Sequence, residues 1–139
     1  MSWTDVNLIE VKTTLETLPE QNFKFQVLGA STSKFDEEEV QVKAKVAEGP
    51  FAGTPVYVRY PSPAKQDWSP RVMKRLIEKL GVEVEESEAH DPVAYFNRVA
   101  GIPGGAFFVA PIKHRTVQTA TGQNVIKAEP DIFRVEAVA

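Results

Sequence analysis

The residues of this chain best suited to binding chemistry lie on two short alternating segments, residues 40–46 and 56–60. Successive side chains of a β-strand point to opposite faces, so each segment is expected to have an apolar face and a polar face. The polar faces carry two lysines, an arginine and an aromatic ring: Lys43, Lys45, Tyr57 and Arg59. Cationic groups beside an exposed ring are suited to a polyanion whose bases can stack.

The connection between these segments, residues 48–55, is rich in glycine and proline and predicts a β-hairpin. A second interpretation of the polar face stays open at this point. A sheet with one wet side needs polar residues there, and lysines protect exposed strands from aggregation.

Length and composition favour one soluble domain. The 139 residues are 42% hydrophobic and can bury a core without disulfides, and there is no cysteine. A chain without cysteine fits a reducing compartment, and the amino-terminal residues show no signal-peptide pattern. No apolar run approaches the ~20 residues of a membrane span. We therefore expect a cytoplasmic protein with no membrane partner.

The net charge of −3 argues at first against a nucleic-acid partner. Two acidic runs, residues 36–39 and 83–91, hold nine of the 19 acidic residues and no lysine or arginine. The remainder has 16 basic residues against ten acidic, so a locally positive surface is compatible with an acidic chain. The runs themselves are interpreted as solvated loops.

The order of expected elements is three strands, two helices and two strands. A strand begins near Phe23, and residues 29–36 are expected to form the turn that leads to Val40. Ser69 and Pro70 predict the start of a helix that Gly81 ends, and Asp91 caps a second helix that Gly101 closes. Tyr95 and Phe96 in that helix are expected to be buried.

Two further strands complete the pattern. The strand over residues 106–117 contains Pro111, which implies an edge position or a bulge. After a turn at residues 121–124, residues 125–128 and 132–136 are expected to form one last strand in two pieces. Residues 1–20 are expected to form an amino-terminal helix or arm, in which Trp3 and Leu8 need cover that a homodimer could provide.

This order predicts a mainly β fold with a helical insertion over residues 21–139. Specifically, it matches a five-stranded OB-type Greek-key barrel with its helices between strands three and four. Other small β-barrels and α+β sandwiches have the same number of strands and helices.

Several short motifs suggest a family: Leu18-Pro19 before the strand at Phe23, the turn Val46 to Gly53, a basic helix ending at Leu80-Gly81-Val82, Lys113-His114-Arg115, and Thr121 to Asn124. Together they resemble a family of small bacteriophage proteins, formerly a phage domain of unknown function, identified as OB-fold single-stranded-DNA-binding proteins. The resemblance covers roughly residues 18–136.

The resemblance implies that the chain coats single-stranded DNA in phage replication or recombination, without strong sequence preference and alongside other replication or recombination proteins. In OB folds the surface of strands two and three forms the groove. Three further residues could extend it: Trp68, Lys113 and Arg115. Each also has a structural interpretation, because Trp68 could cover the core and the two cations could guard an edge strand.

Other functions are less favoured by the residues. No nucleotide-binding loop, nucleophile elbow or zinc-protease motif is present, and we expect neither an enzyme nor a metal or cofactor site. His90, next to Asp91, is interpreted as an exposed loop residue. The alternative is a non-enzymatic phage module that binds protein through an OB-like barrel. Oligomeric state and the choice between DNA and RNA stay open.

Overall fold

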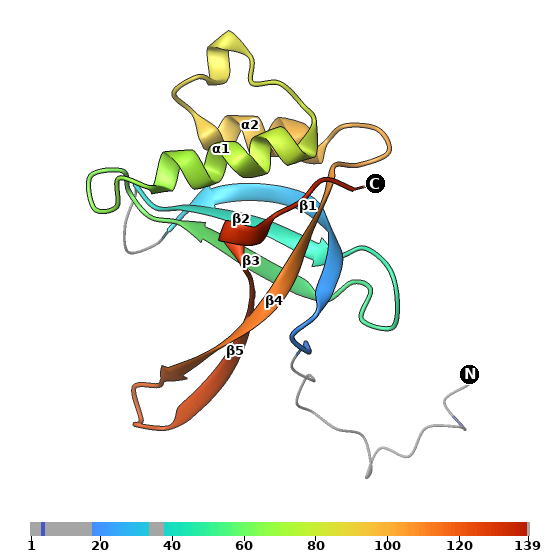
Figure 1. Cartoon of the computed structure of the whole chain (residues 1–139), viewed down its shortest axis with the longest axis vertical. Helices are drawn as coiled ribbons and strands as arrows, with labels where there is room; N and C mark the ends of the chain where they lie inside the picture. Colours follow the sequence, from blue (N-terminus) through green and yellow to red (C-terminus); the bar gives the residue numbers. More distant parts are fainter. Residues whose placement is uncertain (1–3, 5–17, 34–37, 139) are drawn as a thin grey trace.

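The protein, seen here as a computed structural model, is described at Thr4, residues 18–33 and residues 38–138 (Figure 1). The strands are β1 (Asn22–Thr32), β2 (Val40–Val46), β3 (Pro55–Tyr60), β4 (Phe107–Gln118) and β5 (Asn124–Pro130). The helices are α1 (Ser69–Leu80) and α2 (Pro92–Ala100), with short 3-10 turns η2 (Glu86–Glu88) and η3 (Ile132–Arg134). The expected order of strands and helices is the order observed.

All five strands belong to one antiparallel sheet in the order β3-β2-β1-β4-β5. Strands β3 and β5 approach each other, but within the described ranges no hydrogen-bonded ladder joins them. The fold is therefore a mainly β, open five-stranded sheet with two helices. The closed OB-type barrel stays a prediction.

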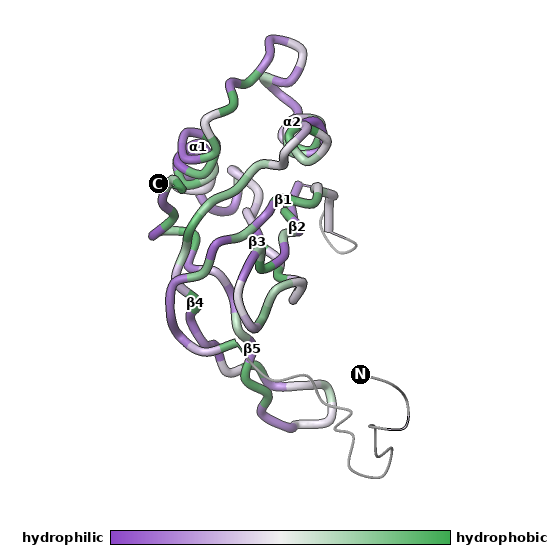
Figure 2. The backbone as a smooth tube through the Cα atoms, turned by 90° about the vertical axis from the view of Figure 1, so that its right-hand side faces the viewer, coloured by the Kyte–Doolittle hydropathy of each residue, from purple (hydrophilic) through white to green (hydrophobic). Residues whose placement is uncertain are grey.

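One face of the sheet packs against the helices to form the core. Alternate residues of β1, β2 and β3 are buried, as the period-two patterns predict. Phe25, Val42 and Phe108 are fully buried together with Leu76 of α1 and Phe96 of α2. Both helices lie on one side of the sheet, and the β4–β5 hairpin extends away from them in both views (Figures 1 and 2).

Strand β1 is longer than expected, because residues 29–32 continue the strand instead of opening the turn. A β-bulge between Val27 and Gly29 lets the strand bend and keep its pairing with β2 as far as Thr32. Gly29 has φ +147°, which glycine adopts without strain. The expected turn was thus wrong at its first residues, and residues 34–37 of it lie outside the described ranges.

Pro111 lies neither on an edge strand nor in a bulge, so that expectation was wrong. Strand β4 pairs with β1 through residues 107–111 and with β5 through residues 112–118. Pro111 is the last β4 residue paired with β1. Because one ladder ends where the next begins, a missing donor there does not interrupt either pairing.

The last expected strand was wrong in its second half. After β5 ends at Pro130, the side chain of Asp131 accepts a hydrogen bond from Phe133 N (3.1 Å) and the chain forms η3. Beyond this turn, Glu136 forms an isolated antiparallel bridge with Val109. A local side-chain acceptor after a proline thus favours a 3-10 turn over a continued strand.

The helix boundaries follow the predicted signals with one exception. Asp91 Oδ1 accepts from Ala94 N (3.1 Å), and Gly81 ends α1 with φ +74°. Ser69, however, is not the cap of α1: Trp68 occupies that position, and Ser69 is buried. The expected burial of Tyr95 and Phe96 is confirmed.

The expectation of a helix or arm over residues 1–20 falls almost entirely outside the described residues. Leu18 is the exception of note, since it is buried in the core and its carbonyl oxygen lies 2.6 Å from His114 Nε2. Among the residues that can be described, no helix has the length and apolar character needed to cross a membrane.

Candidate nucleic-acid interface

The four residues singled out on the predicted hairpin share the face of the sheet that points away from the core, which we call the outer face. Lys43 lies directly opposite Tyr57 across the β2–β3 ladder. Arg59 lies opposite Gln41, two residues along the same ladder. Lys43, Tyr57 and Arg59 are exposed and Lys45 is half-buried, whereas the valines between them are buried. The structure therefore brings this part of the predicted site together.

The outer face continues across β1 to β4. The register places Lys45 beside Gln26 of β1, and Gln26 beside Phe107 of β4. Lys24 of β1 lies over the Phe107 ring, with its Nζ 4.7 Å from the ring centroid. Lys24 and Gln26 were missed as site residues, although the alternation of residues 23–27 already predicted their common face.

A hollow of about 330 Å³ opens on the outer face beside the β1 bulge. Its lining combines residues of three strands with one helix residue: Leu28, Gly29, Ala30, Ser31, Gln41, Lys43, Tyr57 and Asn97. Asn97 of α2 holds the bent strand, because its Oδ1 accepts from Ala30 N (2.9 Å) and its Nδ2 donates to Ala30 O (3.1 Å). No local sequence signal indicated this contact between residues 67 positions apart.

On β1, β2 and β3 the charged side chains of the outer face are all positive. Strands β1, β2 and β3 carry Lys24, Lys43, Lys45 and Arg59 and contain no acidic residue. Within the described ranges, the side chains of Lys43, Lys45 and Arg59 form no ion pair. These cations are therefore available to a bound anion, and the acidic runs of the chain lie on other segments.

The other predicted residues lie apart from this group. Trp68 is half-buried against the core, as the structural interpretation expected, and its ring lies 5.2 Å from the Phe133 ring of η3. Lys113 Nζ lies 5.8 Å from the centroid of the same Phe133 ring. These three residues form a second aromatic and cationic cluster, in which Phe133 (48% exposed) was missed by sequence reasoning.

Arg115 lies further along the β4–β5 hairpin, where its guanidinium donates to Glu129 at 2.6 Å. This pairing reduces the charge that Arg115 offers to a ligand. Among the described residues, no ion pair, hydrogen bond or ring contact joins Arg115, Lys113 or Trp68 to the Lys43 and Tyr57 pair.

The two histidines have different surroundings. The His114 ring contacts Leu18 O and lies 3.5 Å from the Glu20 carboxylate, so it links the start of the described chain to β4. His90 is exposed, as expected. Across the described residues, no group of three or more histidine and acidic side chains is placed to hold a metal ion.

Comparison of the chain with family models, with curated proteins and with solved structures finds no match. The resemblance to phage single-strand binders accordingly stays an expectation from the motifs. The candidate site rests on the geometry and charge of the outer face.

Proposed function

We propose that the protein binds single-stranded DNA, without strong sequence preference, along the outer face of β1, β2 and β3. The observation that carries the proposal is the pairing of exposed Lys43 with exposed Tyr57, inside a surface that has four cations and no acidic residue. Action in phage DNA replication or recombination is part of the proposal and comes from the motif resemblance.

The cations supply the phosphate contacts. Lys43, Lys45 and Arg59 lie on adjacent strands and are not neutralised by described acidic side chains. Contacts of this kind recognise the backbone and not the bases, which accounts for binding without sequence preference.

Tyr57 supplies a stacking platform. Half of its surface is exposed, although a tyrosine is usually well covered. Stacking of a base on an aromatic side chain contributes ~1 to 3 kcal/mol and tolerates any base. Duplex DNA keeps its bases stacked inside the helix, so this contact favours the single strand.

An OB-type barrel is also part of the proposal. The order β3-β2-β1-β4-β5, with β5 near β3, agrees with the strand order of such a barrel whose last seam is open. The β4–β5 hairpin extends beyond β1, β2 and β3 (Figure 1), where it could continue the path of a bound strand.

The test is a titration of fluorescently labelled oligo-dT and of a duplex of equal length at several salt concentrations. We expect tighter binding of the single strand and affinity that falls steeply with salt. Absence of binding to either probe at low salt would refute the proposal and favour the protein-binding alternative. Equal affinity for both probes would refute the role of Tyr57 stacking.

A further inference from the structure

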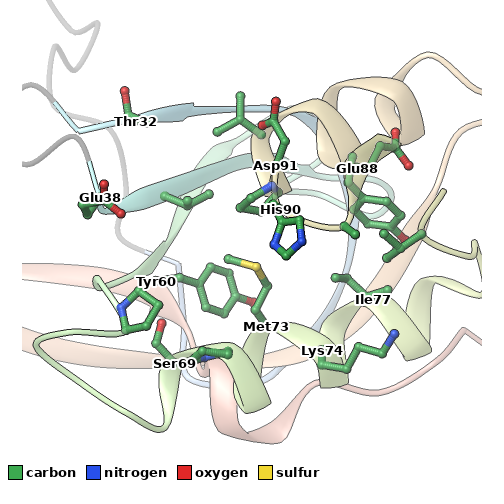
Figure 3. A pocket seen from close by; sticks show the side chains of 18 of the residues that line it. Thr32, Glu38, Tyr60, Ser69, Met73, Lys74, Ile77, Glu88, His90 and Asp91 are labelled. Atoms are coloured by element: carbon green, nitrogen blue, oxygen red, sulfur yellow. The ribbon is translucent and has the colours of Figure 1, made fainter. Parts of the chain in front are cut away.

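A larger cavity of about 870 Å³ lies on the opposite side of β2 from the outer face (Figure 3). It is bounded by α1, by the segment from Val84 to Val93 and by the ends of β1, β2 and β3. We call it the helix cavity. Its walls are largely apolar and include Met73 and Ile77 from α1 and Val93 from α2. An apolar cavity of this size is typical of a binding site.

Tyr60 is one of the lining residues of this cavity, and its buried hydroxyl group has no hydrogen-bond partner among the described residues. Tyr60 is only 1% exposed, and its ring extends from β3 toward Met73 (Figure 3). Burial raises the pKa of this phenol well above its ordinary value, so it stays a neutral donor. Because buried hydroxyl groups are nearly always paired, an orphaned one indicates a missing partner.

The rim of the helix cavity is acidic on the side of residues 85–91. Glu85, Glu86 and Asp91 line it and are exposed. Arg98 holds this segment in place, since it pairs with buried Glu88 through two bonds of 2.7 and 2.8 Å and donates to Glu83 O. Elsewhere the lining carries Lys74 of α1 and, next to the start of β2, Glu38. Arg98 thus holds the backbone of this acidic segment at the cavity before any ligand arrives.

We propose that the helix cavity binds a segment of a partner protein in which a large apolar side chain stands next to lysine or arginine. The apolar side chain displaces the adaptable Met73 side chain, so that a backbone carbonyl of the segment accepts from the Tyr60 hydroxyl beneath it. The cationic side chain of the segment pairs with Glu86. Lys74 elsewhere in the lining repels the cation and therefore sets the direction of the segment.

This site is separate from the proposed DNA surface. Val40 lines the helix cavity, and its neighbour Gln41 lines the hollow on the outer face, because successive residues of β2 point to opposite sides. The acidic rim repels phosphates. The protein would therefore hold single-stranded DNA and a partner protein at the same time.

The probe is a fluorescein-labelled ten-residue peptide with Leu-Phe-Lys-Arg at its centre and glycine and serine elsewhere. Two matched peptides replace Lys-Arg by Glu-Glu, or Leu-Phe by Ser-Ser. Anisotropy with the full chain is expected to show saturable binding of the first peptide and at least roughly tenfold weaker binding of the other two. Equal binding of the three peptides, or none, would overturn the proposal.

The site is assigned by variants at exposed positions. Glu86→Lys is expected to lower the affinity for the probe peptide roughly fivefold or more. Glu83→Lys changes charge in the same segment outside the cavity lining and is expected to leave affinity nearly unchanged. Equal effects of the two variants would overturn the assignment. Binding of oligo-dT is expected to be no weaker in either variant.

Tyr60→Phe separates a binding role of the hydroxyl from a structural role. Removing a buried, unpaired hydroxyl is expected to leave the melting temperature unchanged or raise it. It is also expected to lower the affinity for the probe peptide roughly threefold or more. A lower melting temperature with unchanged peptide affinity would show that the hydroxyl serves the fold and overturn its place in the site.

Discussion

Lys43 and Tyr57 lie directly opposite each other on the solvent side of the β2–β3 ladder. Opposed residues in an antiparallel pair have Cβ atoms roughly 4.5–5.5 Å apart. A phosphate contact and a stacking surface are therefore within one nucleotide of each other. This juxtaposition makes the outer face testable with few substitutions.

Reversal of charge at Lys43 and Lys45 is expected to weaken the binding of oligo-dT strongly. The double variant Lys43→Glu with Lys45→Glu should lower affinity about tenfold or more at low salt, because two phosphate contacts become repulsive. It should also reduce the slope of log affinity against log salt by about 1.4 in magnitude, at ~0.7 per contact on a single strand. Both values come from one salt series of anisotropy titrations.

Arg75→Glu with Lys79→Glu is the matched control, because it reverses the same number of charges at two exposed residues of α1. We expect a much smaller loss of affinity in this variant. A loss equal to that of the β2 variant would assign binding to general charge and contradict the outer face as the site.

Tyr57 is expected to contribute through its ring and not through its hydroxyl. Tyr57→Ala should cost ~1 to 3 kcal/mol of oligo-dT binding, whereas Tyr57→Phe should retain most of the affinity. The thermal transition should change little in the second variant, which keeps the cross-strand ring. If alanine binds as well as tyrosine, the bases do not stack here.

Gly29 is expected to be required for the bend of β1. A Cβ at this position would lie 2.7 Å from Asn97 Oδ1, and φ of +147° strains any other residue. Gly29→Ala should therefore lower the free energy of unfolding by about 1 to 3 kcal/mol. Denaturant titration measures this value.

Gly101→Ala is the control for Gly29, since its φ is −89° and an added Cβ would meet its nearest atom at an ordinary 3.5 Å. Gly101→Ala should lower the free energy of unfolding much less than Gly29→Ala does. Equal stability losses would mean that the bulge tolerates a side chain, and that the contact with Asn97 yields readily.

The Arg98 and Glu88 pair is expected to make stability depend on pH. Hydrogen bonding to Arg98 holds the pKa of the Glu88 carboxyl below its ordinary value of 4.5. A carboxyl with a lower pKa in the folded state stabilises the fold above its unfolded pKa, and this contribution is lost as the pH falls through the folded pKa.

Denaturant titrations between about pH 2 and pH 7 should thus show a loss of stability below about pH 4.5 that is smaller in Glu88→Gln. Glu86→Gln, at an exposed neighbour, should keep the dependence of the unchanged chain. The same slope in all three proteins would contradict a stabilising role of the pair.

Local signals predicted much of the fold. Alternation located β2 and β3 and their faces, and capping and breaking residues located both helices within a residue. These features depend on neighbours along the chain, which the sequence displays directly. Predictions failed where a distant partner decided the outcome, as for Gly29, whose bulge faces Asn97, and for Pro111, whose position depends on which strands flank β4.

The sequence by itself determined that Lys43, Lys45, Tyr57 and Arg59 share a solvent face, because the two-residue period of a strand is a local property. Only the tertiary structure decided that Lys24, Gln26 and Phe107 extend this face, and that Trp68 and Lys113 gather around Phe133 instead. It also decided that the buried Tyr60 hydroxyl, at the wall of the helix cavity, is left unpaired among the described residues. These relationships join segments far apart in the chain, and they exist only once strand order, helix docking and burial of the core have brought those segments together.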